Sequence, residues 1–486
     1  MTRTRLLWLA IALFVAAALR YLPLEMSILL VGAASFFVVA LLWPPVILLA
    51  IALAVPFGPS LPLGGFAVGT ADLLAGFLLG VWVARGLAHR HLPRPRVPLV
   101  PPLLLYLAAL LISLETAWSL KAALPELAKW LEMLALYIAF LALAEVRWPL
   151  ITDLKRALPV FLLLAASAEA LLGLAQFFLR IGPPGFIILG RFLRAYGTFA
   201  QPNPYAGYLG LVLPLGVSLS LHALTTLIPA ARGRITLTLQ DWVALLFYPV
   251  TTAIIGLGLL ASWSRGGWLG MVAGLGLVVA LRSRRAAVLS GLLLFLLVAA
   301  AVLGAMNLLP AVLSERFQGL EDWTLFLRPV ELRSIKITGE NFALVERMAH
   351  WWAAYAMWLE HPITGVGVGN YPIAYETYRM PGWKDPLGHA HNILLNVMAE
   401  TGLVGLAAYI VLWAWVFLYG LLALRRTRGH ARAIVVGALG GLTHLTVHNL
   451  FDNLYVHGMY LYVALLMALL SVGNTPTYDS TTQGEV

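Results

Sequence analysis

Apolar runs that are long enough to cross a lipid bilayer recur along most of this chain. Each is roughly 15 to 22 residues long, which as an α-helix covers a hydrocarbon core of about 30 Å. The 486 residues are 61% hydrophobic and only 11% charged, with a mean hydropathy of +0.87. A soluble domain of this size could not bury so much apolar surface. The runs are continuous rather than alternating, which excludes a membrane β-barrel.

The pattern therefore predicts an all-α polytopic membrane protein with about 12 to 14 transmembrane helices. We expect N-terminal transmembrane helices at 1–306, a large loop at 307–391, C-terminal transmembrane helices at 392–472 and a polar tail at 473–486. The first run, 6–22, follows two arginines as in a signal peptide, but no clear small-residue cleavage site comes after it, so we expect it to be retained. Because the chain has no cysteine, disulfides, iron–sulfur clusters and thiolate zinc sites are excluded.

The basic residues divide unevenly between the two sides of the membrane. If the N-terminus is cytoplasmic and the spans alternate, 18 Lys and Arg residues fall in cytoplasmic segments and 7 in short outside loops. The positive-inside rule therefore predicts that both termini are cytoplasmic and that the large loop lies outside. Long loops without a function are uncommon, so we expect the large loop to contribute to a site.

The middle of the large loop has the pattern of an interfacial helix. Residues 341–361 show helical periodicity, and Pro362 should end the helix. Aromatic side chains in this helix are expected at headgroup depth, namely Trp351, Trp352, Tyr355 and Trp358. The glycine-rich turn 365–371 follows. It is a poor candidate for a dinucleotide site, since no strand precedes it and no helix clearly follows it.

Four arginines fall in segments that are predicted to lie outside the membrane, where the short loops contain few charged residues. Arg191, Arg194 and Arg265 lie in short outside loops, and Arg347 lies on the expected loop helix. A guanidinium group matches phosphate oxygens bidentately and keeps its charge in a low-dielectric setting. We therefore predict that these arginines converge on an anion, for which a lipid pyrophosphate is the obvious candidate at this depth. Alternatively, each arginine contacts lipid headgroups or caps a helix end.

His391 lies at the mouth of a span, after a polar loop. A neutral imidazole, with an ordinary pKa of about 6.5, can accept a proton from a hydroxyl group near neutral pH. A histidine that merely caps a helix is the alternative. His389, His391, His448 and Asp452 could together hold zinc, but no two of the histidines have the spacing of a helical ligand pair, so we expect no metal. We expect His448 and Asp452 to support the site or contact the substrate.

The segment HAHNILLNVMAETGLVG, at 389–405, resembles the end of the large periplasmic loop in O-antigen ligases. In that family a His followed by Asn, Ser or Gln stands nine residues before Gly-x-x-Gly or Gly-x-x-Thr. Here His391-Asn392 stands nine residues before Gly402-Leu403-Val404-Gly405. Further segments are similar to family features in the family's order: 197–203, 264–266 and 347–369. The resemblance covers roughly residues 158–472.

The resemblance implies an inverting, metal-independent glycosyltransferase of the bacterial inner membrane, with its site facing the periplasm. A glycan would move from undecaprenyl pyrophosphate to a hydroxyl of lipid A-core or another glycan. No cofactor and no nucleic acid are implied. His391 would be the general base. The residues that would bind substrate are Arg265, Arg194, Arg347, Arg191 (interchangeable with Arg194), Asn203, Asn392, His448 and Asp452.

Other functions remain open at this point. A polysaccharide polymerase of the same superfamily would need a similar site. An anion transporter is less favoured, because inverted repeats, broken helices and midplane charges are not evident in the sequence. A structural role would not require histidine and arginine residues that face a lipid surface.

Overall fold

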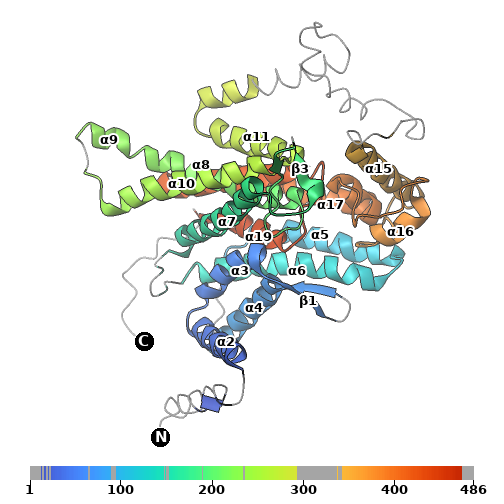
Figure 1. Ribbon diagram of the computed structural model, residues 1–486, viewed down its shortest axis with the longest axis horizontal. Helices are drawn as coiled ribbons and strands as arrows, with labels where there is room; N and C mark the ends of the chain where they lie inside the picture. The colour runs from blue at the N-terminus through green and yellow to red at the C-terminus, as the bar shows by residue number, and fades with distance from the viewer. Residues whose placement is uncertain are drawn as a thin grey trace.

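The computed structural model describes residues 23–292 and 342–472, together with positions 13, 16, 17, 20 and 337. Short gaps lie at 64–65, 89–94, 147, 149–150, 152, 189 and 234–235. The described part is a bundle of α-helices with two small β-hairpins (Figure 1). Its fold class is the predicted one, an all-α polytopic membrane protein.

Six described helices are long and apolar enough to cross a membrane. They are α2 (Leu24–Leu42), α4 (Thr70–Ala88), α7 (Leu154–Leu179), α8 (Pro202–Leu224, continued by α9, Leu227–Ala231), α10 (Leu239–Ala261) and α17 (Ile393–Ala423). Further helices in the bundle are α3 (Pro45–Phe57), α5 (Val100–Ile112), α6 (Leu120–Leu143), α11 (Arg265–Ala280), α18 (Gly429–His448) and α19 (Met459–Leu469). The expected span at 6–22 and the end of the expected N-terminal helices, from 293 to 306, lie largely outside the described residues, so the expected helix count stays a prediction.

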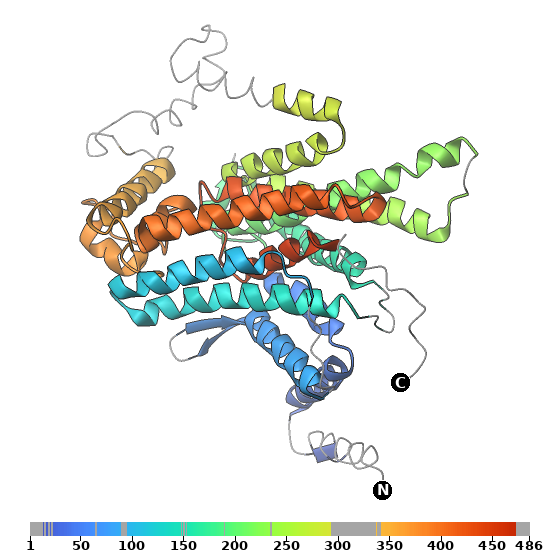
Figure 2. The same cartoon turned by 180° about the vertical axis from the view of Figure 1, so that it is seen from behind.

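The helix α8 lies at the centre of the bundle and packs against α18, α11, α10 and α7. Small residues allow this close approach. A Cβ atom on Gly437 of α18 would lie 2.5 Å from Leu215 Cα, and one on Gly441 would lie 2.2 Å from Leu211 O. In lipid the hydrophobic effect does not drive helices together, so membrane helices associate through close packing contacts of this kind. In Figure 2, α17 runs alongside α5 and α6, and α17 and α5 are in contact.

The described part of the large loop begins with a long helix. The helix α15 (Phe342–Glu360) matches the expected helix at 341–361 and buries one face against α17. Trp352 and Tyr355 lie on its exposed side, but whether they reach lipid headgroups stays a prediction. The rest of the loop, at 307–341, lies outside the described residues except for position 337.

One expectation for this loop was wrong. A helix, α16 (Tyr371–Tyr378), follows the glycine-rich turn directly, because Asn370 and Pro372 are compatible with a helix start. The turn is nevertheless unsuited to a dinucleotide. Cβ atoms on Gly365 and Gly367, both with positive φ, would collide with the backbones of Glu400 and Ala117. These glycines are needed for close packing within the protein.

The helix α17 is broken at Gly402, which has φ +62° and ψ −161°. The amide groups freed by this break donate to the chain after α15: Leu403 N bonds to Pro362 O at 2.9 Å, and Val404 N to Ile363 O at 3.3 Å. A Cβ atom on Gly402 would lie 2.2 Å from Ile363 C. The first glycine of the Gly-x-x-Gly pattern thus attaches the large loop to α17.

The two hairpins were not expected from the sequence. The strands β1 (Ser60–Leu63) and β2 (Phe66–Gly69) pair between α3 and α4. The strands β3 (Ile187–Ile188) and β4 (Phe192–Leu193) pair between α7 and α8. The second hairpin includes Arg191 in its turn and leads directly into Arg194.

Candidate active site

The start of α17 is tied to the loop between α18 and α19. Asn392 caps α17 by accepting hydrogen bonds from Leu394 N at 3.0 Å and Leu395 N at 3.1 Å. Its amide nitrogen donates to Leu450 O at 3.1 Å. Ile393 N also donates to Asn449 O at 2.8 Å. These bonds place His391 next to the segment that carries Asp452.

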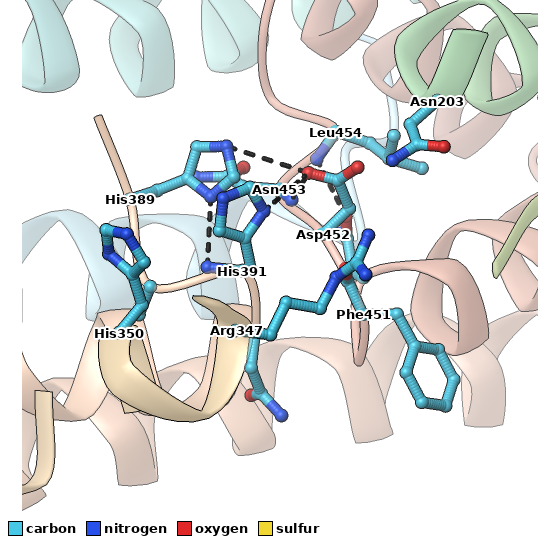
Figure 3. A network of polar contacts seen from close by, with 12 residues as sticks. Asn203, Arg347, His350, His389, His391, Phe451, Asp452, Asn453 and Leu454 are labelled. Atoms are coloured by element: carbon cyan, nitrogen blue, oxygen red, sulfur yellow. Dashed lines mark hydrogen bonds and ion pairs between the residues drawn. The ribbon is translucent and has the colours of Figure 1, made fainter. Parts of the chain in front are cut away.

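Asp452 faces two histidine rings that pack edge to face against each other (Figure 3). Its Oδ1 is 3.6 Å from His391 Nδ1 and 3.6 Å from His389 Nε2. Burial by itself would raise the pKa of Asp452, but the facing His391, His389 and His448 side chains more than offset this and hold it well below its ordinary value. Asp452 is therefore an anion at neutral pH.

His389 has a defined orientation and charge. The backbone N–H of His391 donates to His389 Nδ1 at 3.1 Å, so the neutral ring carries its proton on Nε2, which faces Asp452. Burial, reinforced by His391, Lys129 and Arg347, outweighs Asp452 and lowers the pKa of His389 to about 4. His389 is accordingly neutral at physiological pH.

His391 itself is strained and lacks a firm partner. Its φ of +52° is in the left-handed region, which is uncommon for a residue other than glycine and often marks a functional site. Both ring nitrogens are buried, and neither is within hydrogen-bond distance of a partner in the described part of the chain. If Nδ1 carries the proton toward Asp452, then Nε2 has a free lone pair that can accept a proton.

Three arginines come from three different parts of the chain. Arg194 donates to Ser262 O at 3.0 Å and to Trp263 O at 3.3 Å, and Arg347 donates to Phe451 O at 3.3 Å. Arg265 is exposed at the N-terminus of α11, where the helix dipole also favours an anion. Among the described residues, no carboxylate forms an ion pair with any of the three. Burial and the neighbouring Arg347 and Arg265 lower the pKa of Arg194, as expected where like charges are crowded.

One cavity of about 900 Å³ contains all these groups. Arg194, Arg265, Arg347, His389, His391 and Asp452 all line it. The volume is within the range of small-molecule sites. Side chains placed far apart in the sequence thus line a single cavity, in which two histidines and a carboxylate lie together with three arginines that form no ion pair within the described part of the chain.

The other residues expected from the sequence divide into two groups. Asn203 lines the cavity and accepts a hydrogen bond from Ser264 Oγ at 2.9 Å, which joins the start of α8 to the start of α11. His448 is buried and also lines the cavity.

Two expected residues do not line the cavity. Asn392 is occupied as the cap of α17 and is not among the lining residues. Arg191 is exposed, its guanidinium group lies 5.3 Å from the Phe192 ring, and it does not line the cavity. Arg194, rather than Arg191, therefore faces the site.

The fold also brings together three of the four residues considered for zinc. Potential ligand atoms of His389, His391 and Asp452 all lie within 4.8 Å of one another. Sequence spacing could not detect this, since the ligands come from two loops. Neutral imidazoles and a carboxylate are suitable zinc ligands. The same geometry equally suits direct pairing of the carboxylate with the two rings. A metal-removal experiment distinguishes a zinc site from this direct pairing.

Several lining residues were not singled out from the sequence. Glu346 lies beside Arg347 on α15, and burial raises its pKa. Glu126 and Lys129 on α6 line the cavity and form an ion pair at 2.6 Å. The sequence contained a signal for this pair, since two opposite charges stand three residues apart inside an apolar run. Charged residues are rare in membrane helices unless they have a function.

Part of the chain matches a known protein family. Residues 250–410 match the family model described as O-Antigen ligase. This segment includes Arg265, Arg347 and His391, and it confirms the resemblance found in the sequence. The match is shorter than the expected 158–472 and leaves Arg194 and Asp452 outside. No curated protein gave a match.

Proposed function

We propose that this chain, which carries an O-antigen ligase domain and is thereby assigned to the superfamily of O-antigen ligases and polymerases, transfers a glycan from undecaprenyl pyrophosphate to an acceptor hydroxyl. We place this reaction at the periplasmic face of the bacterial inner membrane. The observation that carries the proposal is the cavity that combines His391 with three arginines, none of which is ion-paired within the described residues. Lipid A-core or another glycan would be the acceptor.

The arginines would hold the diphosphate and stabilise its departure. As the bond between the anomeric carbon and the phosphate oxygen breaks, its electron pair goes to the pyrophosphate, whose negative charge grows. Arg194, Arg265 and Arg347 can neutralise this charge with fixed donors, which costs no reorganisation during the reaction. Pyrophosphate is a good leaving group in this setting, so no acid catalyst is required.

His391 would activate the acceptor. In this scheme its Nε2 takes the proton of the acceptor hydroxyl while the oxygen forms a bond to the anomeric carbon. The resulting imidazolium ion is stabilised by Asp452, which faces Nδ1 at 3.6 Å. This division of roles between a base and an orienting carboxylate is a general one in acid–base catalysis. Attack from the face opposite the leaving group inverts the anomeric configuration.

Reconstituted protein can test this function. Purified full-length chain in proteoliposomes is given an undecaprenyl-pyrophosphate-linked glycan with a fluorescent label, together with an envelope glycolipid fraction from the source cells. We expect labelled glycan on a new carrier and release of undecaprenyl pyrophosphate. Glycan that instead lengthens on undecaprenyl pyrophosphate would indicate a polymerase. Anion flux that persists in a variant lacking both Arg265 and His391, without any glycan transfer by the unaltered chain, would indicate a transporter.

A further inference from the structure

A second cavity, of about 820 Å³, adjoins the candidate active site. The two cavities share a wall formed by Glu126, Lys129, Phe199, Val456 and His457. The hairpin β1–β2, the C-terminal end of α3, the N-terminus of α4 and the N-terminal half of α6 form most of the remaining lining. A molecule in the second cavity would therefore lie beside the cavity that contains His391.

The two cavities differ in charge. Arg194, Arg265 and Arg347 line only the first cavity, whereas Asp72 and Glu132 line only the second. On the shared wall, Lys129 and Glu126 compensate each other through their ion pair. The second cavity therefore presents carboxyl groups where the first presents guanidinium groups, and it disfavours a pyrophosphate, which the first cavity attracts.

Asp72 and Glu132 are held in fixed positions. The Tyr460 hydroxyl lies 2.5 Å from Asp72 Oδ1 and 2.8 Å from Glu132 Oε2, and Gly69 N donates to Asp72 Oδ2 at 2.8 Å. An ionised carboxylate has about four acceptor positions, so these contacts leave several for a ligand. Such preorganised acceptors suit hydroxyl or ammonium donors, because little conformational freedom is lost on binding.

We propose that the second cavity binds the acceptor of the transfer through a hydroxyl-rich sugar that is neutral or carries an amine. This inference rests on the proposed function, in which the arginines hold the donor pyrophosphate. The acceptor then reaches His391 from the second cavity, past the shared wall. The donor's pyrophosphate is disfavoured in that cavity, so the two substrates do not compete for one position. The sugar bound there carries no phosphate or carboxylate, since Asp72 and Glu132 would repel either group.

Saturation kinetics separate the two cavities. In the proteoliposome assay described above, initial rates are measured against the donor and against the envelope glycolipid fraction used as the acceptor probe. The double variant Asp72→Asn/Glu132→Gln should raise half-saturation for the acceptor about tenfold, the size expected for one lost charge-assisted hydrogen bond. Half-saturation for the donor should not change. Glu115→Gln removes an exposed carboxylate that lines neither cavity and serves as the matched control.

A second variant covers the case in which the double variant does not fold. Ala67 is exposed on β2 and lines the second cavity, so Ala67→Trp fills space there without a change of charge. Ala67→Trp should likewise raise the acceptor concentration that gives half-saturation. Acceptor saturation that is unchanged in both variants, or a shift in donor saturation instead, overturns the acceptor site while the transferase function stands. If the unaltered chain binds undecaprenyl pyrophosphate but transfers no glycan, the proposed function fails and the acceptor site fails with it.

Discussion

Asp452 Oδ1 faces His391 Nδ1 at 3.6 Å, although the two residues belong to different loops. The contact depends on the start of α17, where Asn392 donates to Leu450 O. The same residue therefore caps the helix and sets the distance between the proposed base and its carboxylate. This explains why an asparagine next to His391 is useful even though it does not line the cavity.

Replacing Asp452 with Asn should lower the turnover number by about 100-fold or more. The amide could donate a hydrogen bond to His391 Nδ1, which would favour the tautomer with its proton on Nε2 and so block the base. The donor concentration that gives half-saturation should change little. Initial-rate kinetics measure both values. Asp385→Asn removes an exposed carboxylate from the loop that carries His391 and serves as a control. An Asp452→Asn rate equal to that of the unaltered protein would contradict the role given to Asp452.

Arg194 and Arg191 should behave differently when each is changed to Ala. Arg194→Ala should reduce transfer by about 100-fold, as is typical when a donor to a developing anion is lost. Arg191→Ala should leave the rate nearly unchanged, since its side chain lies against Phe192 outside the cavity. Initial rates at low donor concentration provide the comparison. A larger loss for Arg191 than for Arg194 would mean that the donor binds elsewhere.

Metal chelation should not affect transfer. In the proposed scheme His389, His391 and Asp452 act through their own protons and charges, so dialysis against a strong chelator should leave the rate as it was. Metal analysis of the purified protein by mass spectrometry gives an independent measurement. Activity that disappears on chelation and returns with zinc would instead identify these three residues as metal ligands.

Stability should decrease as the pH falls from about 6.5 to about 4. The pKa of His389 and that of His350 are both lowered to about 4, mainly by burial, whereas histidine in an unfolded chain has a pKa of about 6.5. The unfolded state therefore binds more protons in this window, and acidification favours it. The midpoint of thermal unfolding in detergent measures the effect. His350→Gln should make the dependence on pH shallower, and a midpoint that rises on acidification would be the opposite of this expectation.

The sequence allowed the fold class and much of the site to be predicted, because hydrophobicity and charge are local properties. The apolar runs predict helices, and the position of His391 before a span predicts its place at the mouth of α17. The pattern around Arg347 likewise predicted α15 with nearly correct bounds.

Other features depend on contacts that a single sequence does not contain. The break of α17 at Gly402 and the hydrogen bonds from Leu403 to Pro362 that follow from it require the fold. The pairing of Asp452 with both His389 and His391 joins two loops. The second cavity requires α6 to lie beside the hairpin β1–β2, and short strands of this kind have little periodicity from which they could be predicted.

The effect of His391→Gln on transfer tests the central claim most directly. Glutamine keeps a polar side chain of similar size but cannot act as a base near neutral pH. We expect the transfer rate to fall by about 100-fold to 10,000-fold, while undecaprenyl pyrophosphate still binds with unchanged affinity and thermal unfolding is unaltered. A His391→Gln variant that transfers glycan at the full rate would contradict the assignment of His391 as the base.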